Sequence, residues 1–120
     1  YRVIEQYALI LFDFDRTDIK ARNEDIVHRI IDRIADIPTA KVRIVGHTDT
    51  IGKAEYNVSL SERRAAAAYQ QMRTSGIGED LDMTHEGAGP FHPMYDNDLP
   101  EGRALNRTVT VTIAYEQKDN

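Results

Sequence analysis

The sequence predicts an α/β protein, a two-layer βαβαββ sandwich in which two helices lie on one face of a mixed sheet. Short segments with apolar residues at alternate positions predict the strands, and two longer segments with apolar residues at every third or fourth position predict the helices. The order of these segments is typical of that architecture. With 120 residues, 41% of them hydrophobic and 29% charged, we expect one domain over residues 1–120, with an ordered core from about 7 to 115 and a polar C-terminal tail.

The first half of the chain is predicted to form a strand, a helix and a second strand. Ala8–Phe14 reads as a strand, because a run of apolar residues passes into an alternation of Phe and Asp. An amphipathic helix is expected from about Ala21 to Asp36, and Pro38 closes it. In the second strand, Val42–Val45, apolar residues alternate with charged ones, which predicts burial on one side only.

The second half is predicted to supply the other helix and two more strands. The helix runs from about Glu55 to Ser75, and Gly76 is a favourable C-terminal cap. Leu81 and Met83 indicate a short strand that ends at Gly87. The segment from Gly89 to Gly102, rich in Pro and Asn, is expected to be a long loop. Valine, isoleucine and threonine alternate over Val109–Tyr115, which predicts the last strand.

Composition and charge exclude several classes of partner. The formal net charge is −5, so nucleic acid and anionic lipid surfaces are not expected to bind. No apolar run approaches the about 18 residues that a membrane-spanning helix needs, so this chain is not expected to insert directly into a membrane. The chain has no cysteine, and its four histidines do not follow a metal-ligand spacing. We therefore expect no metal and no cofactor.

The segment 46–65 carries the strongest functional pattern, an acid and a base fifteen residues apart across a strand-to-helix junction. Ligands of open α/β sheets tend to bind at such strand ends. Arg64 shares one helix face with Leu60, so its guanidinium is expected to point toward the protein interior. A guanidinium in that position needs a partner, because burying an unpaired charge is costly. Asp49 is the expected partner, either directly, as a structural salt bridge, or through a ligand.

The chain resembles the OmpA-like domain, a peptidoglycan-binding module of the bacterial envelope, over about nine-tenths of its length. The resemblance rests on ordered motifs: the strand 11–15, G-H-T-D at 46–49, Y-N-x-x-L-S-x-x-R-A at 56–65, S-G-I at 75–77, G-x-G at 87–89, Pro93, Asn97 and G-R-x-x-N-R at 102–107. It implies the βαβαββ fold and a periplasmic domain that tethers an outer-membrane or envelope protein to the cell wall, with other envelope proteins as further partners. The family usually has a second arginine where this chain has Thr108.

The resemblance also implies a ligand and roles for individual residues. In the family, the aspartate and arginine that match Asp49 and Arg64 hold diaminopimelate, the third residue of the peptidoglycan stem peptide. A carboxylate suits the ligand's ammonium group, and a planar guanidinium can grip its carboxylate through two parallel hydrogen bonds. Because this ligand is zwitterionic, the protein need not be basic to bind an anionic polymer.

Further candidate residues surround this pair. Asp15 at the end of the first strand is expected to contact the ligand, whereas its neighbour Phe14, a further candidate, is better explained as a core aromatic. Thr48 and Asn57 can hydrogen-bond a ligand, but such residues at turns and helix starts commonly satisfy backbone groups instead. Arg103, Asn106 and Arg107 lie in the closing segment of the family pattern, where we expect them to brace the loop or border the groove.

Two alternatives remain open at this stage. Asp13 to Thr17 match D-x-D-x-T, the nucleophile motif of haloacid-dehalogenase-type phosphatases, in which the first Asp attacks phosphorus and the second acts as acid and base. That chemistry also needs a lysine and a later acidic pair at strand ends, and the last strand here ends in Ala114-Tyr115. The other alternative is a protein-interaction domain of the same fold that does not bind glycan.

Overall fold

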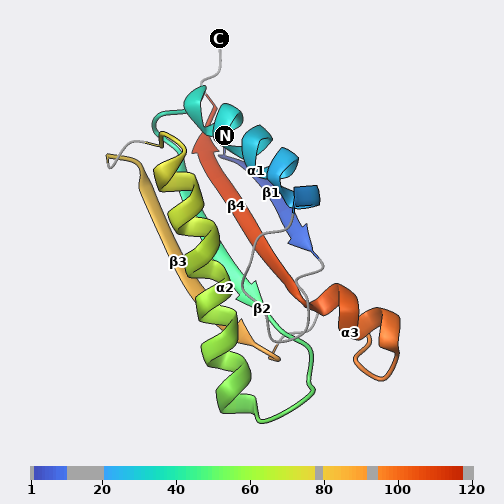
Figure 1. Cartoon of the computed structure of the whole chain (residues 1–120). Helices are drawn as coiled ribbons and strands as arrows, with labels where there is room; N and C mark the ends of the chain where they lie inside the picture. The colour runs from blue at the N-terminus through green and yellow to red at the C-terminus, as the bar shows by residue number, and fades with distance from the viewer. Residues whose placement is uncertain (1, 11–20, 78–79, 92–94, 118–120) are drawn as a thin grey trace.

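A four-stranded mixed sheet with two long helices on one face organises the chain (Figure 1). The computed structural model describes residues 2–10, 21–77, 80–91 and 95–117. In chain order the elements are β1 (Arg2–Ile10), α1 (Ala21–Ala35), β2 (Lys41–His47), α2 (Ala54–Thr74), β3 (Asp82–Gly89), α3 (Pro100–Asn106) and β4 (Thr108–Glu116). The strand order is β1-β4-β2-β3, with β4 antiparallel to both of its neighbours and β2 parallel to β3. The predicted fold class is thereby confirmed.

The core lies between the helix layer and one face of the sheet. In β2 and β4, the residues that face the helices are buried, and in β2 they alternate with exposed or half-buried ones, as the sequence predicted. The same periodicity gives α1 and α2 their buried stripes. The main members are Val27, Ile30, Ile34, Val42, Ile44, Ala65, Ala68, Met72, Val109, Val111 and Ile113. No helix in the described ranges is long and apolar enough to cross a membrane.

Glycine lets α2 pass unusually close to the ends of β2 and β3. A Cβ atom on Gly46 would lie 1.9 Å from the backbone oxygen of Ser61, and one on Gly87 would lie 2.4 Å from the Ser61 hydroxyl. That hydroxyl accepts a hydrogen bond from the backbone N–H of Gly89 at 2.8 Å and donates to the carbonyl of Val58 at 2.7 Å. These contacts determine where the start of α2 lies relative to the strand ends.

Two element boundaries differ from the predictions. β1 begins at Arg2, six residues before the expected start at Ala8, because the whole segment pairs with β4 from Arg2↔Glu116 onward. The part of the predicted first strand beyond Ile10 lies outside the described residues. β3 continues to Gly89 instead of ending at Gly87, because its glycines still pair with β2.

The prediction of a long loop from Gly89 to Gly102 was wrong in its last part, because α3 begins at Pro100. Proline suits the first helical position, but a glycine inside a helix lowers the helix propensity of the segment. Because of Gly102, no clear helix signal is present in the sequence here. In the structure Gly102 packs against the backbone of Asp96, where a Cβ atom would lie 1.8 Å from the carbonyl oxygen. Tertiary contact therefore explains why this residue is part of a helix.

Candidate ligand-binding site

The loop that leaves β2 is held in a defined shape by its own polar groups. Thr48 donates its backbone N–H to the carbonyl of Gly89 at 3.0 Å and its hydroxyl to the carbonyl of Asp49 at 2.9 Å. One carboxylate oxygen of Asp49, Oδ1, accepts the backbone N–H of Ile51 at 3.0 Å. This contact two residues ahead is a local turn that suits Asp. The loop thus presents the other carboxylate oxygen, Oδ2, for further contacts.

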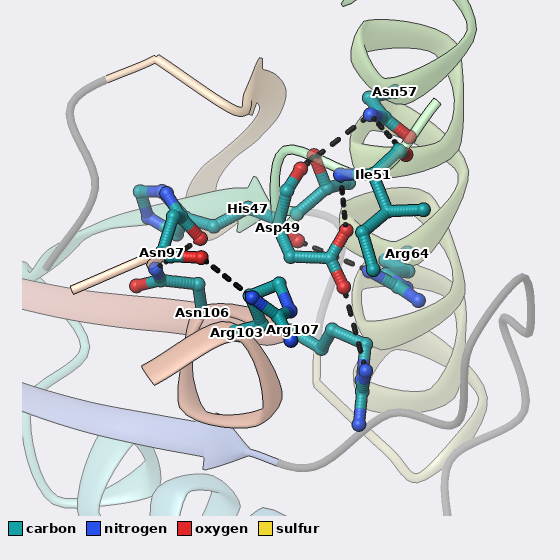
Figure 2. A network of polar contacts seen from close by, with 10 residues as sticks. His47, Asp49, Ile51, Asn57, Arg64, Asn97, Arg103, Asn106 and Arg107 are labelled. Atoms are coloured by element: carbon teal, nitrogen blue, oxygen red, sulfur yellow. Dashed lines mark hydrogen bonds and ion pairs between the residues drawn. The ribbon is translucent and has the colours of Figure 1, made fainter. Parts of the chain in front are cut away.

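Asn57 on the first turn of α2 ties the loop to the helix. Its side-chain amide donates to the carbonyl of Ile51 at 2.9 Å and to that of Asp49 at 3.4 Å (Figure 2). Asn57 and Thr48 are both buried and both bond backbone groups. These contacts agree with the alternative that the two residues satisfy backbone groups instead of binding a ligand.

Arg64 is fully buried, with 0% of its surface exposed, and its Nη1 donates to the carbonyl of His47 at 3.2 Å. Its predicted inward orientation is therefore confirmed. Asp49, the partner expected for Arg64 either directly or through a ligand, is 3% exposed and pairs through Oδ2 with Nη1 of Arg107, at 3.4 Å.

The reason that Arg107 lies here is the sheet register. β4 pairs with β2 so that Val109 lies opposite Gly46, which brings the residue before β4 close to the loop that follows β2. Figure 2 shows the Asp49 carboxylate directed toward the guanidinium groups of both Arg64 and Arg107. No spacing in the sequence indicates this proximity, because 58 positions separate Asp49 from Arg107.

A pocket of about 150 Å³ opens at this junction. It is lined by Thr48, Asp49, Ile51, Gly52, Tyr56, Asn57, Leu60, Arg64 and Arg107. Four of the six predicted site residues therefore meet in one place, whereas Phe14 and Asp15 lie outside the described residues. Among the residues described, no group of acidic, histidine or cysteine side chains is arranged to hold a metal ion.

The sequence interpretation missed the apolar part of the lining. Ile51, Tyr56 and Leu60 form walls around the charged groups, and only Leu60 was identifiable beforehand, by its helix face. A buried carboxylate beside two guanidinium groups can hold a ligand that carries both an ammonium and a carboxylate. Apolar walls strengthen such contacts by excluding water.

The closing segment braces this site from the side of α3. The Asn106 side chain accepts the backbone N–H of Tyr95 at 3.0 Å and donates to the carbonyl of Tyr95 at 2.9 Å and to Oδ1 of Asn97 at 2.8 Å. Arg103 donates to the carbonyl of Asn97 at 2.9 Å. These contacts agree with the bracing role expected for the two residues, while Arg107 borders the pocket. Thr108 is buried and donates to the carbonyl of Leu9 at 3.1 Å.

Comparisons with known proteins agree on one family. A family model described as the OmpA family matches residues 11–107. Outer membrane protein A of Bordetella avium is 36% identical over 107 residues, which cover 89% of this chain and 55% of that protein. The peptidoglycan-binding protein ArfA of Mycobacterium tuberculosis is 33% identical over 104 residues, or 87% of this chain and 32% of that protein. The chain thus spans about half or less of the length of these curated relatives.

Solved structures show the same fold. The peptidoglycan-associated lipoprotein from Burkholderia pseudomallei superposes with a TM-score of 0.82 at 24% identity, covering 88% of each chain. The cell wall anchor of the type VI secretion system (T6SS) from Pseudomonas aeruginosa superposes with a TM-score of 0.76 at 26% identity, covering 94% of this chain and 82% of that one.

Proposed function

Because the chain belongs to the OmpA family, we propose that its pocket binds peptidoglycan through the diaminopimelate of the stem peptide and tethers a larger envelope protein to the cell wall. Family membership makes the chain an OmpA-like peptidoglycan-binding module, a non-catalytic periplasmic domain type of outer-membrane and envelope proteins. Beyond family membership, we propose three things: the diaminopimelate ligand, the residues that hold it, and the tethering of a parent protein.

The observation that carries the proposal is one buried acid beside two arginines in a pocket of about 150 Å³. The free end of diaminopimelate carries an ammonium and a carboxylate on a single carbon. Asp49 accepts the ammonium, and Arg64 grips the carboxylate through the parallel donors of its guanidinium. Arg107, already beside Asp49, is near enough to share the same charges. The apolar side chains of Ile51, Tyr56 and Leu60 contact the ligand's methylene groups.

The names of several relatives support peptidoglycan as the polymer that this domain binds. The matching protein of Mycobacterium tuberculosis is called peptidoglycan-binding, the lipoprotein of Burkholderia pseudomallei peptidoglycan-associated, and the structure from Pseudomonas aeruginosa a cell wall anchor. The phosphatase alternative is not retained, since OmpA-like domains are non-catalytic, and its motif at Asp13 to Thr17 lies outside the described residues.

Competition between two stem peptides tests the proposal. A peptide with diaminopimelate and the same peptide with lysine both offer an ammonium, but only the first adds the carboxylate that Arg64 grips. Loss of that contact costs on the order of 2–4 kcal/mol, which corresponds to about 30-fold or more in affinity. Calorimetry should show this preference in the wild type, and equal affinities for the two peptides would disprove the assignment.

Matched variants separate binding from folding. Arg64→Gln should abolish the preference, whereas Arg29→Gln, at an exposed arginine of α1 that does not line the pocket, should keep it. Asp49→Asn retains the oxygen that Ile51 bonds but removes the charge, so it should lose co-sedimentation with diaminopimelate-containing sacculi while circular dichroism stays unchanged. Full binding by a folded Asp49→Asn, Arg64→Gln double variant would leave the protein-interaction alternative as the better explanation.

A further inference from the structure

Most of the large apolar side chains that are exposed in the described part of the chain belong to segments at the end of the molecule where the pocket opens. Of the seven large hydrophobic side chains exposed in the described part of the chain, six belong to the segments that meet at this end, and only Ile4 lies elsewhere. We define these six as the apolar rim: Ile51, Tyr56, Val58, Phe91, Tyr95 and Leu99. Single exposed apolar residues are ordinary, but a concentration of them marks an interaction surface.

Contacts or short stretches of chain link five members of the rim to the pocket, and the sixth, Leu99, belongs to the same segment as Tyr95. Ile51 and Tyr56 line the pocket itself. Val58 packs against Gly89, whose carbonyl bonds the backbone of Thr48, and Phe91 follows two residues later. On the other side, the backbone of Tyr95 bonds the side chain of Asn106, the neighbour of the pocket residue Arg107. Figure 1 shows the loop between β2 and α2, the end of β3 and α3 at one end of the molecule, far from both termini.

Three of the six rim residues are aromatic, and two of these lie outside the pocket. Phe91 is 54% exposed and Tyr95 is 43% exposed. Flat, exposed rings of this kind stack on apolar faces, and a Tyr hydroxyl adds a polar group at the edge. The C–H faces of pyranose sugars offer such a surface without any charge. The rings therefore match the uncharged faces of a saccharide.

Stem-peptide geometry gives a reason for a saccharide to reach the rim. If the side chain of the third stem residue occupies the pocket, as the proposed function states, three extended residues span about 10 Å from that residue's backbone toward the sugar that carries the stem. A pocket of about 150 Å³ is too small to hold this length of peptide, so the sugar lies outside the pocket. A lipid surface fits less well, because the exposed acids Asp96, Asp98 and Glu101 lie among the rim residues of this segment and repel anionic headgroups.

We infer that the aromatic part of the rim, Phe91 and Tyr95, is a second subsite that stacks on the amino-sugar rings of the glycan strand while the pocket holds the stem peptide. This inference rests on the proposed function, since the pocketed residue sets the position of the sugar. The affinity of the domain for peptidoglycan then depends on the glycan as well as on the stem peptide.

The test compares two soluble ligands with the same stem, a disaccharide-tripeptide and the free tripeptide, by calorimetry. The wild type should bind the disaccharide form about tenfold more tightly. Phe91→Ala with Tyr95→Ala should bring this ratio close to one and leave the affinity for the free peptide within about twofold. The hydrogen bonds at Tyr95 run to its backbone, so alanine keeps them. Ile4→Ala, at the other exposed apolar residue, is the matched control and should change neither affinity.

Each other outcome overturns the inference in a distinct way. Equal affinities of the wild type for the two ligands exclude a sugar subsite while leaving the peptide site intact. A loss of affinity for both ligands in the rim variant assigns the aromatic residues to the peptide site or to folding. Binding of the wild type, but not of the rim variant, to vesicles of anionic phospholipid assigns the rim to a membrane. If neither soluble ligand binds the wild type at all, the proposed function fails, and the inference fails with it.

Discussion

Arg107 Nη1 lies 3.4 Å from Oδ2 of Asp49, so the acid of the pocket is paired before any ligand arrives. The Asp49 side chain is 4% exposed and that of Arg107 is 23% exposed. Asp49 is buried with its remaining oxygen already bonded to the backbone of Ile51. The arginine therefore compensates a desolvated charge.

A double-mutant cycle should detect this pair. Arg107→Gln is expected to lower the free energy of unfolding by about 1–2 kcal/mol, because it leaves Asp49 buried with less compensation. In the Asp49→Asn background the same substitution should cost about 1 kcal/mol less. Urea unfolding of the four proteins measures the coupling. Additive effects would show that the 3.4 Å contact contributes no net stability.

Replacing Arg64 by lysine should remove binding although it keeps the charge. The guanidinium donates to the carbonyl of His47 while fully buried, and Arg64 is one of the residues that line the pocket. An ammonium on a flexible stem lacks that fixed fork of donors. We expect the affinity for a diaminopimelate peptide to fall about tenfold or more, measured by competition. Arg63→Lys, at the exposed neighbouring position, should bind like the wild type.

Stability should fall in acid partly through Glu5. Hydrogen bonds from Arg33, at 2.7 to 3.0 Å, hold the pKa of the Glu5 carboxyl below its usual value of 4.5. Since the pKa is lower in the folded state, this contribution is present above pH 4.5 and is lost as the pH falls through the folded-state pKa. The melting temperature of the wild type should exceed that of Glu5→Gln at pH 7, and the difference should shrink toward pH 3. A difference that stays constant over this range would contradict the assigned cause.

Asn106 should control the order of the segment before α3. Its side chain makes three hydrogen bonds, two to the backbone of Tyr95 and one to Asn97. Asn106→Ala removes all three hydrogen bonds of a buried side chain and should lower stability by about 1–3 kcal/mol. Hydrogen exchange should show faster exchange at the Tyr95 amide. Asp98→Ala, at an exposed site of the same segment, is the control and should leave that rate unchanged.

Local periodicity was enough to predict most of the fold. α1, α2, β2 and β4 lie within one or two residues of their predicted bounds, because each has a repeating apolar face that any core would bury. β1 and α3 deviate because their local signals are weak. The N-terminal half of β1 is part of the sheet through its pairing with β4, and α3 contains a glycine that packs on Asp96. The first of these contacts belongs to the assembled sheet and the second to the packing of α3 on the segment before it, so neither leaves a periodic pattern in the sequence.

For the site, the sequence by itself determined which residues share a face and a junction. The helical repeat directed Arg64 inward, and the strand-to-helix boundary placed Thr48, Asp49 and Asn57 at one end of the sheet. The family resemblance gave bordering the groove as one of two roles for Arg107, but only the tertiary structure decided that it lines the pocket and pairs with Asp49. The physical reason is the antiparallel register of β2 and β4, which sets Val109 opposite Gly46 and so brings together two charges that lie 58 positions apart in the chain.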